Sequence, residues 1–320
     1  MAPPVKLPTR KLGRDGPEIT AIGFGLMGLS TAYGSVGPDE DRLKVLDRAW
    51  ELGCTNWDSA DMYGDSEDLL GKWFARHPER RDDIFLATKF GLTVGVREDG
   101  SRGLLVDSSP EYCRQQCEKS LKRLGVSCID LYYIHRVDNK TPIEKTMAEL
   151  VKLQQENKIQ THRAYPPAPR PPCTARAPSR PSPPTKSSIL PGRWRSRVRE
   201  RHTAARLPRA WAFSVFAYAP LGRGIMTGRL RSPDDFEPGD LRRLMPRFSE
   251  ENFAKNLLLV ERFGEMARRK GCSPGAVDHG VVDSAGGGCD SDSGDQECEV
   301  LGGECGRGGC ECGWGGGEGD

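Results

Sequence analysis

The sequence lacks any run of about 18 apolar residues, the length that a helix needs to cross a bilayer. Its first residues, MAPPVKLPTRKLG, also lack the apolar segment of a secretory signal, so we expect a cytoplasmic protein with no membrane partner. Net charge is equally scarce, because 47 basic and 45 acidic residues leave a formal charge of +2. That balance gives no support to a nucleic-acid or anionic-membrane partner.

Apolar residues are also scarce, at 36% of 320 residues with a mean hydropathy of −0.58. Two segments account for much of this shortage of apolar residues. Within the first, the Arg/Pro segment (residues 161–212), the stretch from Thr161 to Ala210 holds eleven Arg and one Lys against one acid, Glu200. The second, the acidic tail (residues 276–320), holds eleven acids against one Arg and fifteen of the 38 Gly. Neither segment has the apolar periodicity of a folded core, so we expect both to be disordered.

Neither unusual segment predicts a binding site. The tail carries Cys298, Cys305, Cys310 and Cys312, but no His lies among them and no second C-x-C pair accompanies them, so we expect no metal. The Arg/Pro segment could attract phosphates, but Tyr165 is one of only two aromatic residues between Thr161 and Ala210 that could stack on bases, and we expect no nucleic acid. The other cysteines are scattered, as in reduced intracellular proteins.

Elsewhere the chain alternates between short apolar runs and amphipathic periods. This alternation predicts an α/β fold with a parallel sheet covered by helices, in which chemistry gathers at the carboxyl ends of the strands. The expected strands are 18–25, 55–58, 84–89, 129–135 and 213–221, and the expected helices are 39–53, 66–76, 110–124, 142–155 and 250–270.

Glycines at 23, 25 and 28 spell G-x-G-x-x-G directly after a strand. A dinucleotide-binding fingerprint opens a helix at its last glycine, so that amide groups face the pyrophosphate. Here Gly34, Gly37 and Pro38 postpone the main helix to about Asp39. A glycine-rich loop that a ligand approaches closely is the better interpretation.

Four titratable residues follow three successive strands: Asp58 and Tyr63, then Lys89, then His135. Singly, each has an ordinary structural explanation, but a parallel barrel brings such strand ends to one site. A phenol has a pKa near 10 and becomes a better acid beside an ammonium group. Lys89 could supply this ammonium group, and Asp58 could keep Lys89 protonated by pairing with it. With His135 orienting an oxygen, the set suits carbonyl reduction, in which a proton reaches an oxyanion as hydride arrives at carbon.

These residues stand in motifs that resemble the aldo-keto reductase family: ITAIGFGLMGLS, NWDSADMYGDSEDLLGKWF, IFLATKFG, KSLKRLGVSCIDLYYIHRVD and VFAYAPLGRGIMTGRL. The resemblance implies a (β/α)8 TIM barrel over residues 7–275, interrupted by the Arg/Pro segment, and a metal-free NADPH-dependent reductase of a small aldehyde or ketone. It implies Asp58, Tyr63, Lys89 and His135 as catalytic residues. By the same resemblance Gly25, Leu26, Met27, Tyr218, Leu221 and Gly222 contact the cofactor.

About five of the eight barrel strands are recognisable, since the family places strands where the Arg/Pro segment and the acidic tail lie. If a permitted codon is chosen for each residue of the tail and the nucleotides are read one position later, they can encode QLTMAWLIAQ and IPIPGTKSVRYLEENVG. These peptides resemble the family's missing helix, strand and phosphate-binding loop. Read two nucleotides later, residues 186–200 can encode VEYSPWTLEIESPGT. We therefore interpret both segments as frame-shifted. Two alternatives remain open: a noncatalytic barrel that senses nicotinamide cofactor within a complex, and an inactive product of a mispredicted gene.

We predict that the 320-residue chain binds NADPH only weakly, because an acidic stretch that repels phosphate stands where the family holds the adenosine phosphate. The fluorescence of NADPH during a titration measures the affinity. Micromolar binding together with cooperative unfolding would show that the two unusual segments do form structure.

Overall fold

The computed structural model describes residues 7–13, 16–97, 99–138, 140–162, 215–216, 218–277 and 300–301. They form two compact units. The first comprises Met1–Ser59, Tyr63–Phe85 and Ser188–Asp320, and the second comprises Ala60–Met62 and Leu86–Ser187. Within the described ranges, no helix is long and apolar enough to span a membrane.

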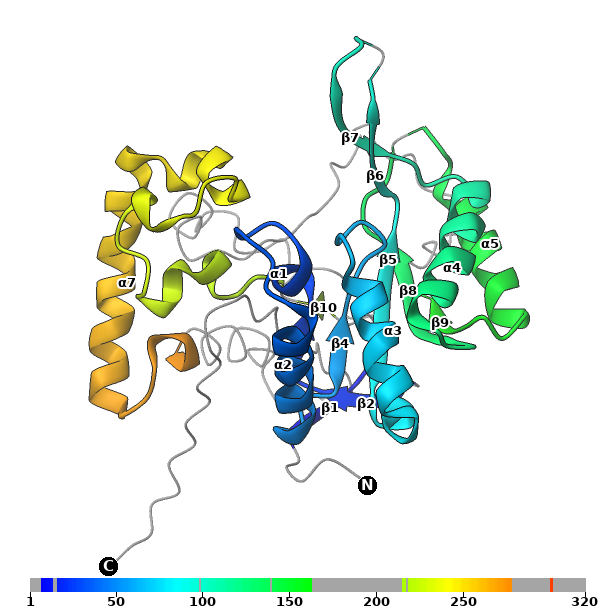
Figure 1. Ribbon diagram of the computed structural model, residues 1–320, viewed down its shortest axis with the longest axis horizontal. Coiled ribbons are helices and arrows are strands. Elements are labelled where there is room, and N and C mark those ends of the chain that lie inside the picture. The colour runs from blue at the N-terminus through cyan, green and yellow to red at the C-terminus, as the bar shows by residue number, and fades with distance from the viewer. Residues whose placement is uncertain are drawn as a thin grey trace, which may run out of the picture. The chain divides into compact units, whose positions relative to one another are not determined.

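Strands and helices alternate through both units (Figure 1). Five strands form a parallel sheet in the order β3-β4-β5-β8-β9, and β5 begins in the first unit at Phe85 and continues in the second. Their bounds are β3 Gly23–Gly25, β4 Asn56–Asp58, β5 Phe85–Phe90, β8 Ile129–Ile134 and β9 Ile159–His162. The helices are α1 Met27–Ser30, α2 Asp39–Glu51, α3 Ser66–Arg76, α4 Pro110–Leu124, α5 Ile143–Gln155 and α7 Glu250–Lys270.

Two short antiparallel hairpins and a further pair of strands lie outside this sheet. The hairpins are β1 Thr9–Lys11 with β2 Glu18–Thr20, and β6 Leu92–Val96 with β7 Arg102–Val106. The further pair is β10 Val215–Phe216 with β11 Val300–Leu301, in parallel. Short 3₁₀ helices complete the described chain at η1 Pro78–Asp83, η4 Gly222–Thr227, η5 Pro233–Asp235, η6 Leu241–Leu244 and η7 Pro246–Phe248.

The helices begin and end where local chemistry directs them. In α4, the Ser109 hydroxyl accepts a hydrogen bond from the Tyr112 amide, and Pro110 occupies the first turn, where its missing N–H costs nothing. Gly125 ends the same helix with a left-handed backbone, and Gly271 ends α7 in the same way. The bounds of α3, α4 and α7 agree to the residue with the predicted helices 66–76, 110–124 and 250–270.

Two strand predictions need correction, and the described strands β9 and β11 were not predicted. The predicted strand 18–25 is split into β2 and β3, because β2 pairs with β1 rather than with the sheet. Within the predicted strand 213–221, only Val215–Phe216 is a described strand, and it pairs with β11. Strand β9 was not predicted, and it extends into the Arg/Pro segment as far as His162. Strand β11 lies in the acidic tail, for which the sequence predicts disorder; the Arg/Pro segment beyond His162 and most of the tail lie outside the described residues.

Each unit has its own apolar core. In the first unit, Trp57 and Trp73 are fully buried with ring centroids 4.7 Å apart. In the second, the Phe90 and Tyr132 rings stack at 4.9 Å. A further cluster in the first unit packs α7 onto the 3₁₀ helices and consists of Ile225, Met226, Phe236, Phe248, Phe253, Val260, Phe263, Ala267 and Val277.

We predict that Phe253→Ala lowers the free energy of unfolding by about 3–5 kcal/mol, because it empties the centre of this cluster between Phe236 and Phe248. Urea unfolding followed by circular dichroism measures the change. The matched control is Leu258→Ala on the same helix, whose side chain is 64% exposed, and we expect it to cost no more than about 0.5 kcal/mol. Equal losses in the two variants would contradict this placement of the core.

Candidate active site

The predicted catalytic residues divide between the two units. Asp58 and Tyr63 belong to the first unit, whereas Lys89 and His135 belong to the second. All six residues predicted to contact the cofactor belong to the first unit. Asp58 and Lys89 lie in strands of the parallel sheet, His135 directly follows one, and Tyr63 lies in the loop between β4 and α3.

In the first unit, strand pairing brings Asp58 beside the predicted cofactor segment Gly25–Met27. Strands β3 and β4 pair so that Gly25 lies opposite Asp58, and the Leu26 amide donates a hydrogen bond of 3.0 Å to the Asp58 carbonyl. The Leu26 side chain is completely buried, whereas Met27 is half-buried and begins α1. Of these three residues, therefore, only Met27 has a side chain that is accessible from outside.

Tyr63 is 5% exposed and lies in the loop that leads into α3. Its carbonyl accepts a hydrogen bond from the Ser66 amide in the first turn of that helix. The next residue, Gly64, has φ = +58°, and a Cβ there would lie 2.8 Å from the carbonyl oxygen of Ser30. Only glycine fits this close left-handed turn, which presses the Tyr63 loop against α1.

A partly exposed ion pair holds the same loop to α2. Arg42 of α2, 6% exposed, donates two hydrogen bonds of 2.8 Å to the Asp65 carboxylate and others to the Leu29 carbonyl and the Ser30 hydroxyl. The Arg42 guanidinium holds the pKa of Asp65 at about 2. Asp65 is two residues from Tyr63, so the pair fixes the position of the candidate general acid.

In the second unit, Lys89 and His135 lie at the same end of neighbouring strands. Lys89 lies opposite Tyr133 in the pairing of β5 with β8, and its Nζ is 5.5 Å from the centroid of the Tyr133 ring. This is within the range at which an aromatic face attracts an ammonium. The His135 amide donates to the Phe90 carbonyl at 2.7 Å, so the residue after β8 is tied to the end of β5.

The turn after His135 is fastened by Asp138, which the sequence did not single out. Its carboxylate accepts hydrogen bonds from the amides of Lys140, Thr141 and Ser108 and from the Thr141 hydroxyl. These bonds lower the pKa of Asp138 against the opposing effect of burial. Asp138 therefore anchors the His135 turn to the start of α4 and to the turn before α5.

The hairpin β6–β7 follows Lys89 directly, and Figure 1 shows it projecting past the end of β5. Its valines at 94 and 96 are 64% and 62% exposed. We did not expect this hairpin from the sequence, although apolar alternation on both sides of Asp99–Gly100 is a hairpin signal. At the start of the hairpin Gly91 has φ = +102°, and a Cβ there would lie 3.0 Å from the Arg136 carbonyl oxygen.

The remaining cofactor candidates lie in a tight turn. The Tyr218 side chain is 41% exposed, Leu221 is half-buried and Gly222 is buried. Gly222, Arg223 and Gly224 have φ values of 58°, 61° and 92°. From Tyr218 to Arg231 there are three Arg and no acidic residue, so an exposed aromatic face stands beside an electropositive turn. These features fit a cofactor that carries a planar ring and phosphates.

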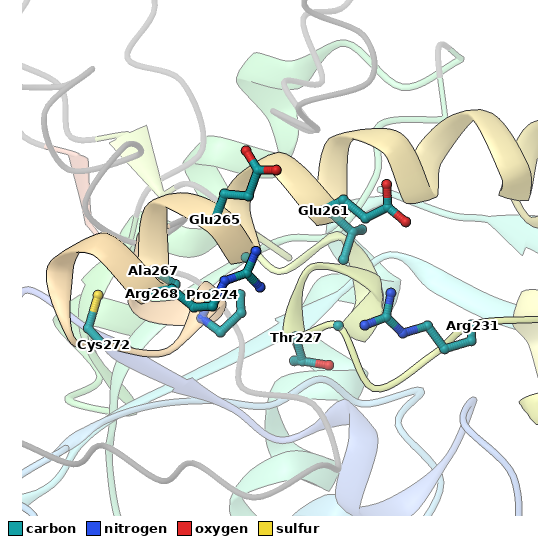
Figure 2. Close-up of a pocket in the computed structure, with 11 residues that line it drawn as sticks. Thr227, Arg231, Glu261, Glu265, Ala267, Arg268, Cys272 and Pro274 are labelled. Carbon is teal, nitrogen blue, oxygen red and sulfur yellow. The ribbon is translucent and has the colours of Figure 1, made fainter.

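A pocket of about 400 Å³ lies along α7, and none of the residues that line it is a predicted site residue (Figure 2). Figure 2 shows Glu261, Glu265 and Arg268 on the helix, with Thr227 and Arg231 across the pocket. Its charges are mixed, and the Thr227 hydroxyl already donates to the Gly224 carbonyl. No group of three or more potential metal-binding side chains occurs in the part of the chain that the structure describes.

Comparison with known proteins agrees with these motifs. The aldo/keto reductase family profile matches residues 21–162. The chain is 42% identical over 281 residues to the aldo-keto reductase str7 of Strobilurus tenacellus, covering 85% of this chain and 78% of that protein. It is 40% identical over 287 residues, with the same coverage, to the aldo-keto reductase yakc [NADP(+)] of Schizosaccharomyces pombe. The chain belongs to the aldo-keto reductase family.

Solved structures of aldo-keto reductases share the fold. The glycerol dehydrogenase AKR11B4 of Gluconobacter oxydans superposes with a TM-score of 0.63 and 26% identity, covering 92% of this chain and 85% of that one. The thermostable aldo-keto reductase Tm1743 gives a TM-score of 0.59 over 94% of this chain and 90% of that one, at 19% identity. The predicted α/β TIM-barrel class is thus confirmed for this aldo-keto reductase, and five of its parallel strands are described.

We predict that Asp65→Asn destabilises the protein at neutral pH and that the difference from the original chain shrinks as the pH falls from about 4 to about 2. The unfolded carboxyl takes up its proton near pH 3.9, whereas the folded one resists protonation until about 2. Stability from the Arg42 pair is therefore present above pH 4 and is lost in this window.

Urea midpoints of both proteins between pH 7 and pH 2.5 measure the effect. Asp82→Asn, at an exposed carboxylate, serves as the control and should follow the original chain at every pH. A difference for Asp65→Asn that stays constant across the range would contradict the prediction.

Proposed function

We propose that this aldo-keto reductase reduces an aldehyde or ketone to an alcohol with NADPH, using Tyr63 as the general acid. The observation that carries the proposal is the sequence Asp58, Tyr63, Lys89, His135 at successive strand ends in a member of this family. The name of the fission-yeast relative supports NADP as the cofactor. Tyr63 is buried in a loop fixed by Gly64 and by the Arg42–Asp65 pair, which suits a proton donor that must keep one position.

In this proposal Tyr63 gives its phenolic proton to the substrate oxygen as the C=O bond is reduced. NADPH, when bound, supplies the hydride that forms the new C–H bond and is itself oxidised to NADP⁺. The Lys89 ammonium lowers the cost of the phenolate left on Tyr63, and the Asp58 carboxylate keeps Lys89 charged. His135 donates a hydrogen bond that orients the carbonyl oxygen, and Tyr63 then regains a proton from solvent.

The segments that fit the cofactor belong to the first unit. The exposed ring of Tyr218 offers a face for the nicotinamide, and the turn at Leu221 and Gly222 offers backbone to the phosphates. The segment Gly25–Met27, held to Asp58 by the Leu26 amide, borders the nicotinamide. Asp58 therefore ties this cofactor segment to β4, the strand that precedes the Tyr63 loop.

We predict that Tyr63→Phe reduces turnover by at least about 100-fold and leaves NADPH affinity within twofold, because the variant loses only the transferable proton. NADPH oxidation at 340 nm across a panel of aldehydes and ketones measures turnover, and NADPH fluorescence measures affinity. Both this chain and a version with the Arg/Pro segment and acidic tail restored to the other frames are assayed.

The matched control is Tyr112→Phe, which removes a half-buried phenol at the start of α4. We expect it to keep its turnover. Reduction that survives Tyr63→Phe would show that another group donates the proton. NADPH binding without turnover of any carbonyl in the original chain would favour the noncatalytic cofactor sensor instead.

A further inference from the structure

Arg242 in η6 is inserted between two aromatic rings. Its guanidinium carbon lies 4.6 Å from the ring centroid of Tyr33 and 4.6 Å from that of Phe236. The same group donates to the Asp240 carboxylate from Nε and Nη2, at 3.0 Å and 2.6 Å, and its Nη1 donates to the Arg223 carbonyl at 3.0 Å. The Asp240 side chain is 1% exposed, so this charge pair is shielded from solvent.

One partner, Tyr33, belongs to the loop that continues from Met27 and α1. This loop is fastened to the region around Arg242 at two further points. The Leu241 amide donates to the Ala32 carbonyl at 3.0 Å, and the Ser35 amide donates to Glu237 Oε2 at 2.6 Å. Gly34 has φ = +86°, and a Cβ there would lie 2.6 Å from the Glu237 carboxylate, so glycine is required for this approach.

Arg223, whose carbonyl accepts a hydrogen bond from Arg242, begins the turn that follows Leu221 and Gly222. Its Nη1 donates to the Tyr33 hydroxyl at 2.9 Å, while its carbonyl accepts from Arg242. Arg223 has φ = 61° and ψ = 39°, a left-handed conformation that costs energy for any residue with a side chain. Contacts to Tyr33 and Arg242 on both sides of the residue offset that cost.

We propose that Arg242 is a positioning residue that sets the spacing between the two cofactor segments of the first unit, Gly25–Met27 and Leu221–Gly222. This inference rests on the proposed function. Arg242 stacks on the ring of Tyr33, in the loop that follows the first segment. It also donates a hydrogen bond to the carbonyl of Arg223, the residue after the second segment. A lysine can do only part of this, because it lacks the planar fork that stacks and donates in several directions. Holding both segments before the cofactor arrives removes the entropy cost of ordering them.

The test compares Arg242→Met, Arg242→Lys and Tyr33→Leu with the control Arg262→Met, an exposed arginine of α7. Hydrogen exchange is followed in peptides covering residues 29–37, 221–229 and 236–245, and NADPH affinity is measured by fluorescence. We expect Arg242→Met to speed exchange at least tenfold in the first two peptides and to weaken NADPH binding at least fivefold. Arg242→Lys should fall between Arg242→Met and the original chain, and Arg262→Met should match the original chain.

Arg242→Met leaves Asp240 buried without its partner, so far-UV circular dichroism checks that the variant folds. Tyr33→Leu keeps the Arg242–Asp240 pair intact and should still speed exchange in both loop peptides. Unchanged exchange in Tyr33→Leu, or NADPH affinity within twofold of the original chain despite faster exchange, would overturn the positioning role.

Failure of the proposed function gives a different pattern. If the original chain does not bind NADPH at millimolar concentration, the proposed activity fails for this chain. The exchange data then still show whether Arg242 couples the two loops, and the frame-restored version supplies the affinity comparison. Tight NADPH binding by the restored version with no effect of Arg242→Met would refute the positioning role alone.

Discussion

Parallel strand pairing fixes where the candidate chemistry lies, because two of the pairings are continued past the strand end by a backbone hydrogen bond. The Leu26 amide binds the Asp58 carbonyl beyond β3, and the His135 amide binds the Phe90 carbonyl beyond β8. A residue just past a strand is thus held almost as firmly as one inside it. Such rigidity matters for proton transfer, since a donor displaced by one ångström loses much of its rate advantage.

Side-chain networks extend this rigidity into the loops. Arg42 and Asp65 hold the Tyr63 loop, Asp138 holds the His135 turn, and Arg242 joins the loops around Tyr33 and Arg223. In each case a charged group is at least partly shielded and bonds to several backbone or side-chain atoms at once. Removing such a partner leaves a buried polar group unsatisfied, which costs about 1–3 kcal/mol. The networks therefore restrict the loops to one arrangement.

The sequence predicted the elements whose signals are local. Helix α4 was predicted to the residue because its cap, its apolar spacing and its final glycine lie within 17 residues of one another. Strand β9 was missed because its four residues, IQTH, contain one aliphatic side chain and follow a helix that the Asn157 turn ends. The strand predicted at 213–221 does not include residues 218–221, because Ala219 has φ = 51°, a left-handed conformation that ends the extended backbone.

The same distinction separates the predicted site residues from those that were missed. Asp58, Tyr63, Lys89 and His135 could be proposed because each follows an apolar run that marks a strand end. The importance of Arg242 depends on Tyr33, far away in the chain, just as the bond from Ser35 reaches across 202 positions to Glu237. An arginine among the many of this chain has no local pattern that reveals such a partner. Only the folded arrangement distinguishes it from the exposed Arg262.

Barrel closure explains why the two unusual segments decide whether this chain can act as its relatives do. Among the described strands, β3 and β9 form the edges of the five-stranded sheet, and β9 ends at His162, where the Arg/Pro segment continues. A TIM barrel leaves no edge strand, because every backbone group along each strand pairs with a neighbour. Open edges would leave those groups without internal partners, at a free-energy cost comparable to the net stability of a domain. The strands that close a family member must therefore come from the segments we interpret as frame-shifted, and restoring their frames tests fold and activity together.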